Sequence, residues 1–164
     1  MNFLAQQDLP VVIIKDDRKR EEARGKMFRF GALYDRSTQA KQALKVVLDM
    51  MAAHDKLVTI SCTEPNVSHQ GLEDEVKAIC GDREVQCIFL EREDANQSVY
   101  KRIKQYLVEQ SNDDNYVDFV ALGNRGINFN SGKEEDKIGT VGKAIIAARK
   151  MNCIFVPCSG KTTA

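Results

Sequence analysis

The sequence has no net charge, no long apolar run and few histidines. Acidic and basic side chains balance at 24 each among the 164 residues, so no field of one sign attracts nucleic acid or an anionic membrane surface. The aliphatic run at residues 11–14 is too short for a signal-peptide core or a membrane span. We therefore expect a cytoplasmic protein with no nucleic-acid partner and no membrane insertion.

Cysteine pairs are also missing. The five cysteines are odd in number and include no Cys-x-x-Cys motif. Three of them lie inside apolar runs, where a thiol usually packs as a small hydrophobic group. We expect a reduced protein without a disulfide framework.

The sequence lacks the motifs of common catalytic sites. His-x-His, His-Glu-x-x-His and Gly-x-Ser-x-Gly do not occur, and the two histidines, His54 and His69, are in neither metal-binding nor triad spacing. His54 ends a predicted helix, where its charge suits the helix dipole, and His69 lies in a polar loop. We expect no catalytic residues and no metal ligands.

After residue 26 the sequence alternates regularly between apolar runs and helical periodicity. The apolar runs predict strands at residues 28–34, 57–63, 85–90, 117–122 and 153–156. Apolar side chains three and four residues apart predict helices at residues 38–53, 72–80, 99–107 and 140–151, with Ser37 and Ser98 as N-caps of the first and third. This alternation predicts an α/β fold, Rossmann-like, with a parallel sheet of five strands and helices on both faces.

The first 26 residues differ from the rest. They hold one β-branched run, residues 11–14, which follows Pro10 and precedes a mixed-charge patch at residues 15–26. Such a run favours an extended backbone, so we predict a short extra strand or an arm docked on an apolar surface. The predicted organisation is an N-terminal extension (1–26), an α/β domain (27–158) and a C-terminal tail (159–164).

Two loops lie where ligands gather in open parallel sheets, beyond the carboxyl ends of strands. One is residues 33–37, and the other begins with Gly123 and Gly126, which permit close backbone approach. Gly139 and Thr140 then open the last helix, whose unpaired N–H groups and dipole favour an anion. Together these features favour a phosphate site, in which Arg125 offers a bidentate contact. The alternative is that the glycines only mark turns.

Two stretches resemble the universal stress proteins. "ALYDRSTQAKQAL" is similar to the strand, Asp-x-Ser and helix that open that family's domain, and "VDFVALGNRG" followed by "GTVGKAIIAARKMNCIFVP" is similar to its closing part. The family's nucleotide signature is Gly, two residues, Gly, nine residues, then Gly and Ser or Thr. Gly123, Gly126, Gly139 and Thr140 match it, with twelve residues in place of nine. The resemblance covers residues 27–157.

The resemblance implies a five-stranded sheet of order 3-2-1-4-5 and an adenine nucleotide, ATP or AMP, between the two loops, with Mg²⁺ accompanying ATP. By position, the residues flanking the nucleoside are Leu33, Tyr34 and Asp35, and those facing the adenine edge are Cys62 or Thr63. The residues holding the phosphates are Gly123, Gly126, Gly139, Thr140 and Val141. The implied order makes residues 153–156 an edge strand, so we expect a homodimer through that apolar edge.

Two functions are compatible with these observations. The first is an ATP- or AMP-binding protein of stress response or signalling, which the near-intact glycine signature favours. The second is a non-catalytic interaction subunit of a larger assembly with a structural or vestigial nucleotide site, favoured by the longer loop and the N-terminal extension. In neither is the protein a dedicated enzyme, and ATP hydrolysis would be a slow side reaction.

Overall fold

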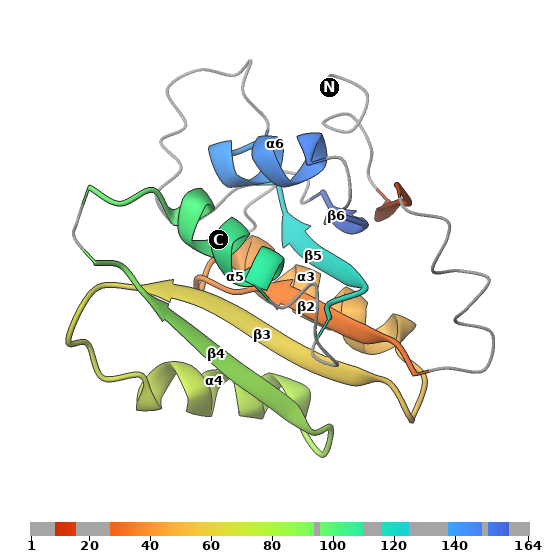
Figure 1. Cartoon of the computed structure of the whole chain (residues 1–164). Helices are drawn as coiled ribbons and strands as arrows, with labels where there is room; N and C mark the ends of the chain where they lie inside the picture. The colour runs from red at the N-terminus through yellow and green to blue at the C-terminus, as the bar shows by residue number, and fades with distance from the viewer. Residues whose placement is uncertain are drawn as a thin grey trace.

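The computed structural model describes residues 9–15, 27–93, 96–109, 116–124, 138–148 and 151–157. Within these residues one sheet runs through the molecule, with helices on both faces (Figure 1). Its strands are β1 (Val11–Ile13), β2 (Arg29–Leu33), β3 (Lys56–Thr63), β4 (Val85–Glu91), β5 (Phe119–Gly123) and β6 (Cys153–Val156). Their order is β1-β6-β5-β2-β3-β4, and all neighbours are parallel except β1 and β6.

The predicted α/β fold is confirmed, and the sheet differs from the prediction in one strand. The five predicted strands are parallel and follow the implied order, since β4, β3, β2, β5 and β6 are consecutive neighbours. The sheet is nevertheless six-stranded and mixed, because β1 of the N-terminal extension pairs antiparallel with β6. The extra strand expected from the β-branched run is therefore present.

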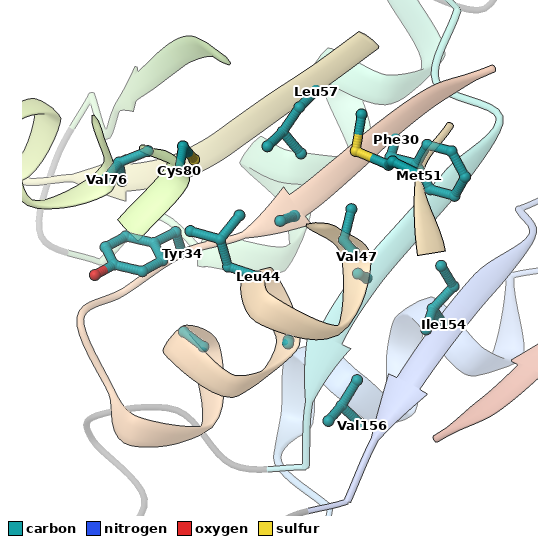
Figure 2. Close-up of a cluster of buried hydrophobic side chains, with 14 residues drawn as sticks. Phe30, Tyr34, Leu44, Val47, Met51, Leu57, Val76, Cys80, Ile154 and Val156 are labelled. Atoms are coloured by element: carbon teal, nitrogen blue, oxygen red, sulfur yellow. The ribbon is translucent and has the colours of Figure 1, made fainter. Parts of the chain in front are cut away.

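Two helices cover each face in the described part of the chain. One face carries α3 (Thr38–Met50) and α4 (Gln70–Cys80), and the other carries α5 (Val99–Glu109) and α6 (Thr140–Ala147). Figure 2 shows Leu44 and Val47 of α3 directed at the sheet, and both are fully buried. Burial of each such side chain contributes roughly 1.5–3 kcal/mol. The apolar spacing of α3 therefore positions this helix, and with it the loop that precedes it.

The last helix ends earlier than its periodicity predicts. The pattern extends to residue 151, whereas α6 ends at Ala147 with Ala148 as an extended C-cap. The ammonium group of Lys15 donates to the carbonyl oxygens of Ile145 (3.1 Å), Ile146 (2.5 Å) and Ala148 (2.9 Å). These carbonyls belong to the end of the helix, and that of Ile145 also accepts from the Ala148 amide (3.1 Å). A cation from the N-terminal extension therefore caps the carbonyl end of the helix.

The prediction that Cys153–Val156 is an edge strand is wrong. Val11 pairs with Phe155 and Ile13 with Cys153, so β1 is the edge strand on this side of the sheet and β6 lies inside it. The residues of β6 are at most 1% exposed. Because β1 already covers this edge, the homodimer expected through residues 153–156 would have to displace it.

In the portion of the chain that the structure describes, no helix is both long enough and apolar enough to cross a membrane.

Candidate functional site

The winding of the sheet reverses between β2 and β5. These strands are adjacent and parallel, yet β2 leads into α3 on one face, and the helix that follows β5 in the sequence, α6, lies on the other (Figure 1). Their carboxyl ends therefore cannot both be covered by the same crossover, and a crevice opens there.

A cavity of about 370 Å³ occupies this crevice, within the range typical of small-molecule sites. Its apolar wall comes from the α5 and α6 side of the sheet and consists of Leu33, Ile60, Val99, Ile103 and Leu122. Such a wall suits the faces of a flat ring, and the polar groups around it decide which ligand fits.

The loop after β2 forms one polar side of the cavity. Asp35, which is exposed, and Ser37 line it. The Asp35 carboxylate accepts a hydrogen bond from the Ser37 amide (3.0 Å), and the Ser37 hydroxyl accepts one from the amide of Ala40 (3.1 Å). Ser37 is thus the N-cap of α3, as its position predicts. The first turn of α3 is capped by the protein itself.

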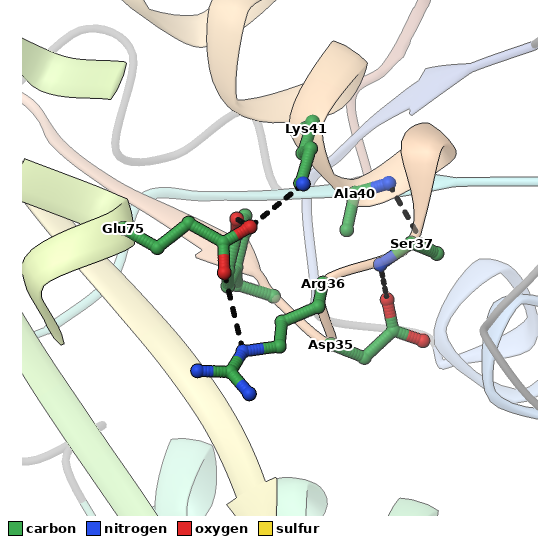
Figure 3. A network of polar contacts seen from close by, with 7 residues as sticks. Asp35, Arg36, Ser37, Ala40, Lys41 and Glu75 are labelled. Atoms are coloured by element: carbon green, nitrogen blue, oxygen red, sulfur yellow. Dashed lines mark hydrogen bonds and ion pairs between the residues drawn. The ribbon is translucent and has the colours of Figure 1, made fainter. Parts of the chain in front are cut away.

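Glu75 of α4 holds this loop from the other side (Figure 3). Its carboxylate accepts a hydrogen bond from the buried phenol of Tyr34 (2.9 Å) and forms ion pairs with Arg36 (3.2 Å) and Lys41 (2.7 Å). The hydrogen bond from Lys41, together with the one from Tyr34, holds the pKa of Glu75 below its ordinary value. Burial, followed by the bond to Glu75, raises the pKa of Tyr34. Arg36 has a φ of 69°, which is uncommon for a side chain of this size, so the network stabilises a strained turn.

The opposite side of the cavity is built by Gly123 and the start of α6. A Cβ at Gly123 would lie 2.6 Å from Cβ of Gln39, so only glycine lets β5 end this close to α3. Gly139 is the N-cap of α6, and its amide donates to the carbonyl of Asn124 (2.7 Å). Among the described residues no side chain caps this helix. The residues of its first turn, Thr140, Val141 and Gly142, line the cavity, and the N–H groups of a first turn have no partner within the helix.

The structure brings most of the predicted site residues together. The predicted residues that line the cavity are Leu33, Tyr34, Asp35, Cys62, Gly123, Gly139, Thr140 and Val141. Arg125 and Gly126 lie outside the described residues. Thr63 is not among the residues that line the cavity, and its hydroxyl lies 3.1 Å from the ring nitrogen of His69, which precedes α4. Of the two residues that the resemblance places at the adenine edge, only Cys62 is among the lining residues.

Two charged residues in the cavity wall were not predicted from the sequence. Glu64 follows β3, Arg92 follows β4, and the two form an ion pair. Glu64 follows the end of the predicted strand directly, and Arg92 follows the observed end of β4. A charged residue directly after a parallel strand is the sequence feature that could have identified them. Burial raises the pKa of the neighbouring Cys62 thiol, while the charge of Arg92 acts in the opposite direction.

The comparisons with known proteins concern the fold. No protein-family model and no curated protein matches this sequence. Among solved structures, the hypothetical protein MJ0577 superposes with a TM-score of 0.64 at 14% identity, over 82% of this chain and 98% of that one. A universal stress protein in complex with cAMP superposes with a TM-score of 0.53 at 16% identity, over 80% and 98%. The resemblance predicted from the two sequence stretches is thereby confirmed at the level of the fold, which is that of a universal stress protein.

Proposed function

We propose that this protein binds an adenine nucleotide, ATP or AMP, in the cavity between the loop after β2 and the start of α6, and that it acts in stress response or signalling. The observation that carries the proposal is the contrast between two helix starts at one cavity. The first turn of α3 is capped by Ser37, whereas the first turn of α6 has no side-chain cap among the described residues. Unpaired N–H groups and the positive end of a helix dipole suit a phosphate group.

Each part of the cavity has a role in this proposal. The backbone amides of Thr140 and Val141 donate hydrogen bonds to the phosphates. Arg125 and Gly126, which follow β5 in the sequence, are proposed to contact the same phosphates. The apolar wall packs against the purine ring, and the carboxylate of Asp35 accepts hydrogen bonds from the sugar hydroxyls. Mg²⁺ strengthens the binding of ATP, because the acidic residues 134–136 would otherwise oppose a triphosphate.

The complex of the universal stress protein neighbour supports the ligand class. That protein binds cAMP, which combines an adenine base with a phosphate. The same combination suits a cavity that has an apolar wall and a helix start for which the described residues provide no side-chain cap.

Titration calorimetry with ATP, AMP and adenosine, with and without Mg²⁺, tests the proposal. We expect binding of at least one nucleotide with a Kd below about 1 mM, or about −4 kcal/mol, and tighter binding of ATP when Mg²⁺ is present. Asp35→Ala should weaken adenosine and AMP alike, because its partner is the sugar. Absence of binding at this level for every ligand would mean that the cavity is not a nucleotide site. Turnover of ATP, followed in the same samples, is expected to be slow.

A second function, as an interaction subunit of a larger assembly, is favoured by the surface of the N-terminal extension. Leu9, Val12 and Ile14 are 74%, 41% and 47% exposed, so exposed apolar side chains lie on and next to the outer strand, β1. An exposed apolar strand edge invites pairing. Native mass spectrometry of the protein purified from its source tests this function and reports any bound nucleotide at the same time.

A further inference from the structure

The ion pair between Glu64 and Arg92 lies at the end of the cavity away from α6. The strands β5, β2, β3 and β4 are consecutive neighbours, so β4 forms one edge of the sheet. Figure 1 shows α6 near β5 and β6, in the half of the sheet away from β4. Arg92 follows β4, so three strand spacings separate it from the end of β5, about 14 Å in all. A phosphate bound at α6 would leave the base of the same nucleotide directed toward Glu64 and Arg92.

Both residues line the cavity, and they differ in how exposed their side chains are. The backbone amide of Arg92 donates to the carbonyl of Thr63 (3.0 Å), which extends the pairing of β3 and β4 by one residue. Its side chain is only 17% exposed, against 53% for Glu64. The guanidinium is thus largely inside the wall, and the carboxylate is partly accessible to a ligand.

The chemistry of the pair is a hydrogen-bond acceptor beside a donor. A carboxylate only accepts and has several lone-pair positions, and a guanidinium only donates, through five N–H groups. Because these groups have several acceptor and donor positions, a carboxylate and a guanidinium that contact each other can both contact a ligand as well. Adenine presents the complementary pattern at one edge, an amino donor at N6 beside an acceptor at N7, whereas a 6-oxo purine presents two acceptors there.

We propose that Glu64 and Arg92 read the edge of the base and select adenine over 6-oxo purines such as hypoxanthine and guanine. The N6 amino group donates to the carboxylate of Glu64, and N7 accepts from the guanidinium of Arg92. A 6-oxo purine places its O6 against the carboxylate, with no hydrogen to donate. This inference rests on the proposed nucleotide site and adds the residues that determine its specificity.

The same pair is a poor phosphate site, which sets the direction of the nucleotide. The charge of Arg92 is already matched by Glu64, whose carboxylate repels an anion. The start of α6 carries no such carboxylate among the cavity-lining residues. A neutral base is therefore favoured at the Arg92 end and the phosphate at the α6 end.

The test compares AMP with IMP, which differ at position 6 of the base, by titration calorimetry on the wild-type protein and two variants. Wild type should bind AMP at least about tenfold more tightly than IMP, because a bidentate contact to a base edge typically discriminates between bases by about this factor or more. Glu64→Gln introduces an amide that also donates to O6, so the AMP to IMP ratio should fall to within about threefold. Glu93→Gln is the matched control, because Glu93 adjoins Arg92 in sequence but does not line the cavity, and its ratio should equal that of wild type.

Inorganic tripolyphosphate, which has no base, completes the test. Its affinity should be the same for wild type and Arg92→Gln, while AMP should bind Arg92→Gln more weakly. A larger loss of tripolyphosphate than of adenosine would place the phosphates at Arg92 and overturn the inference. An unchanged AMP to IMP ratio in Glu64→Gln, or equal binding of AMP and IMP by wild type, would also overturn it while leaving nucleotide binding intact. If wild type binds no purine nucleotide, the proposed function fails, and the inference fails with it.

Discussion

At the scale of single residues, Glu75 connects α4 to the loop that presents Asp35. One carboxylate has three partners, two of them cationic, and they come from the end of β2, the strained turn and the first turn of α3. Sequence periodicity gives Glu75 no special place, since it lies among the polar residues of an amphipathic helix. Its partners are about 40 residues away in sequence, and only the folded chain reveals them.

Replacing Glu75 by glutamine should make the protein less stable and its stability less dependent on pH. The folded-state pKa of Glu75 is lowered, so its contribution is fully present above the ordinary value of 4.5 and is lost as the pH falls through the folded pKa. Urea unfolding should show a loss of about 1 kcal/mol for Glu75→Gln at pH 7, since the ion pairs are partly exposed. The loss should become smaller as the pH falls below 4.5.

Glu73→Gln provides the matched control for this measurement. It removes an ion pair with Lys77 within the same helix, and pairs at this spacing contribute about 0.3 kcal/mol. An equal loss in the two variants at pH 7 would show that the Glu75 network has no special effect.

Gly123 is the second residue whose role depends on a distant segment. A Cβ at this position would meet both the side chain and the backbone of Gln39, and backbone cannot give way as a flexible side chain does. Gly123→Ala should therefore cost about 1–3 kcal/mol in thermal or urea unfolding, as other overpacked positions do.

The control is Gly71→Ala, where the new Cβ meets only the end of the Arg36 side chain at 3.4 Å. In a helix this substitution should be neutral or stabilise by up to about 1 kcal/mol. A Gly123→Ala variant as stable as wild type would contradict the close approach of β5 and α3.

At the scale of elements, β1 and Lys15 of the N-terminal extension provide hydrogen-bond partners for β6 and for the end of α6. The strand β1 covers the edge of β6, and the ammonium group of Lys15 caps the carbonyl end of α6. The amide of Lys15 also donates to the side chain of Asn152, next to β6 (2.8 Å). Because a four-residue apolar run carries no information about its partner, the sequence predicted an extra strand or a docked arm without locating either.

Deleting residues 1–15 should expose β6 and cause self-association. The freed edge is apolar and at most 1% exposed in the intact chain, and unpaired edges of this kind pair with other copies. Size-exclusion chromatography with light scattering should show dimers or larger species for this variant, together with a lower Tm. Deletion of residues 1–8 alone keeps β1 and should behave like the full-length chain. If both deletions gave the same monomer, β1 would not protect the edge.

At the scale of the whole molecule, the alternation of apolar runs and helices predicted the α/β fold, and the resemblance supplied the order of five strands. Most predicted site residues meet at one cavity because parallel strands bring their carboxyl ends to the same edge. What the sequence did not show are contacts between distant side chains. The partners of Glu75, the ion pair of Glu64 with Arg92 and the pairing of β1 depend on tertiary arrangement, which local periodicity does not encode.

The most direct test of the central proposal is the affinity difference between AMP and adenosine, measured by calorimetry for wild type and Gly139→Asp. These ligands differ only in the phosphate, and Gly139 is the N-cap of the helix proposed to bind it. We expect wild type to bind AMP at least about tenfold more tightly, or about 1.4 kcal/mol. An aspartate at this position caps the helix with its own carboxylate, so Gly139→Asp should abolish the difference and leave adenosine binding unchanged. Equal affinity of wild type for the two ligands, or an undiminished preference for AMP in Gly139→Asp, would contradict a phosphate site at the start of α6.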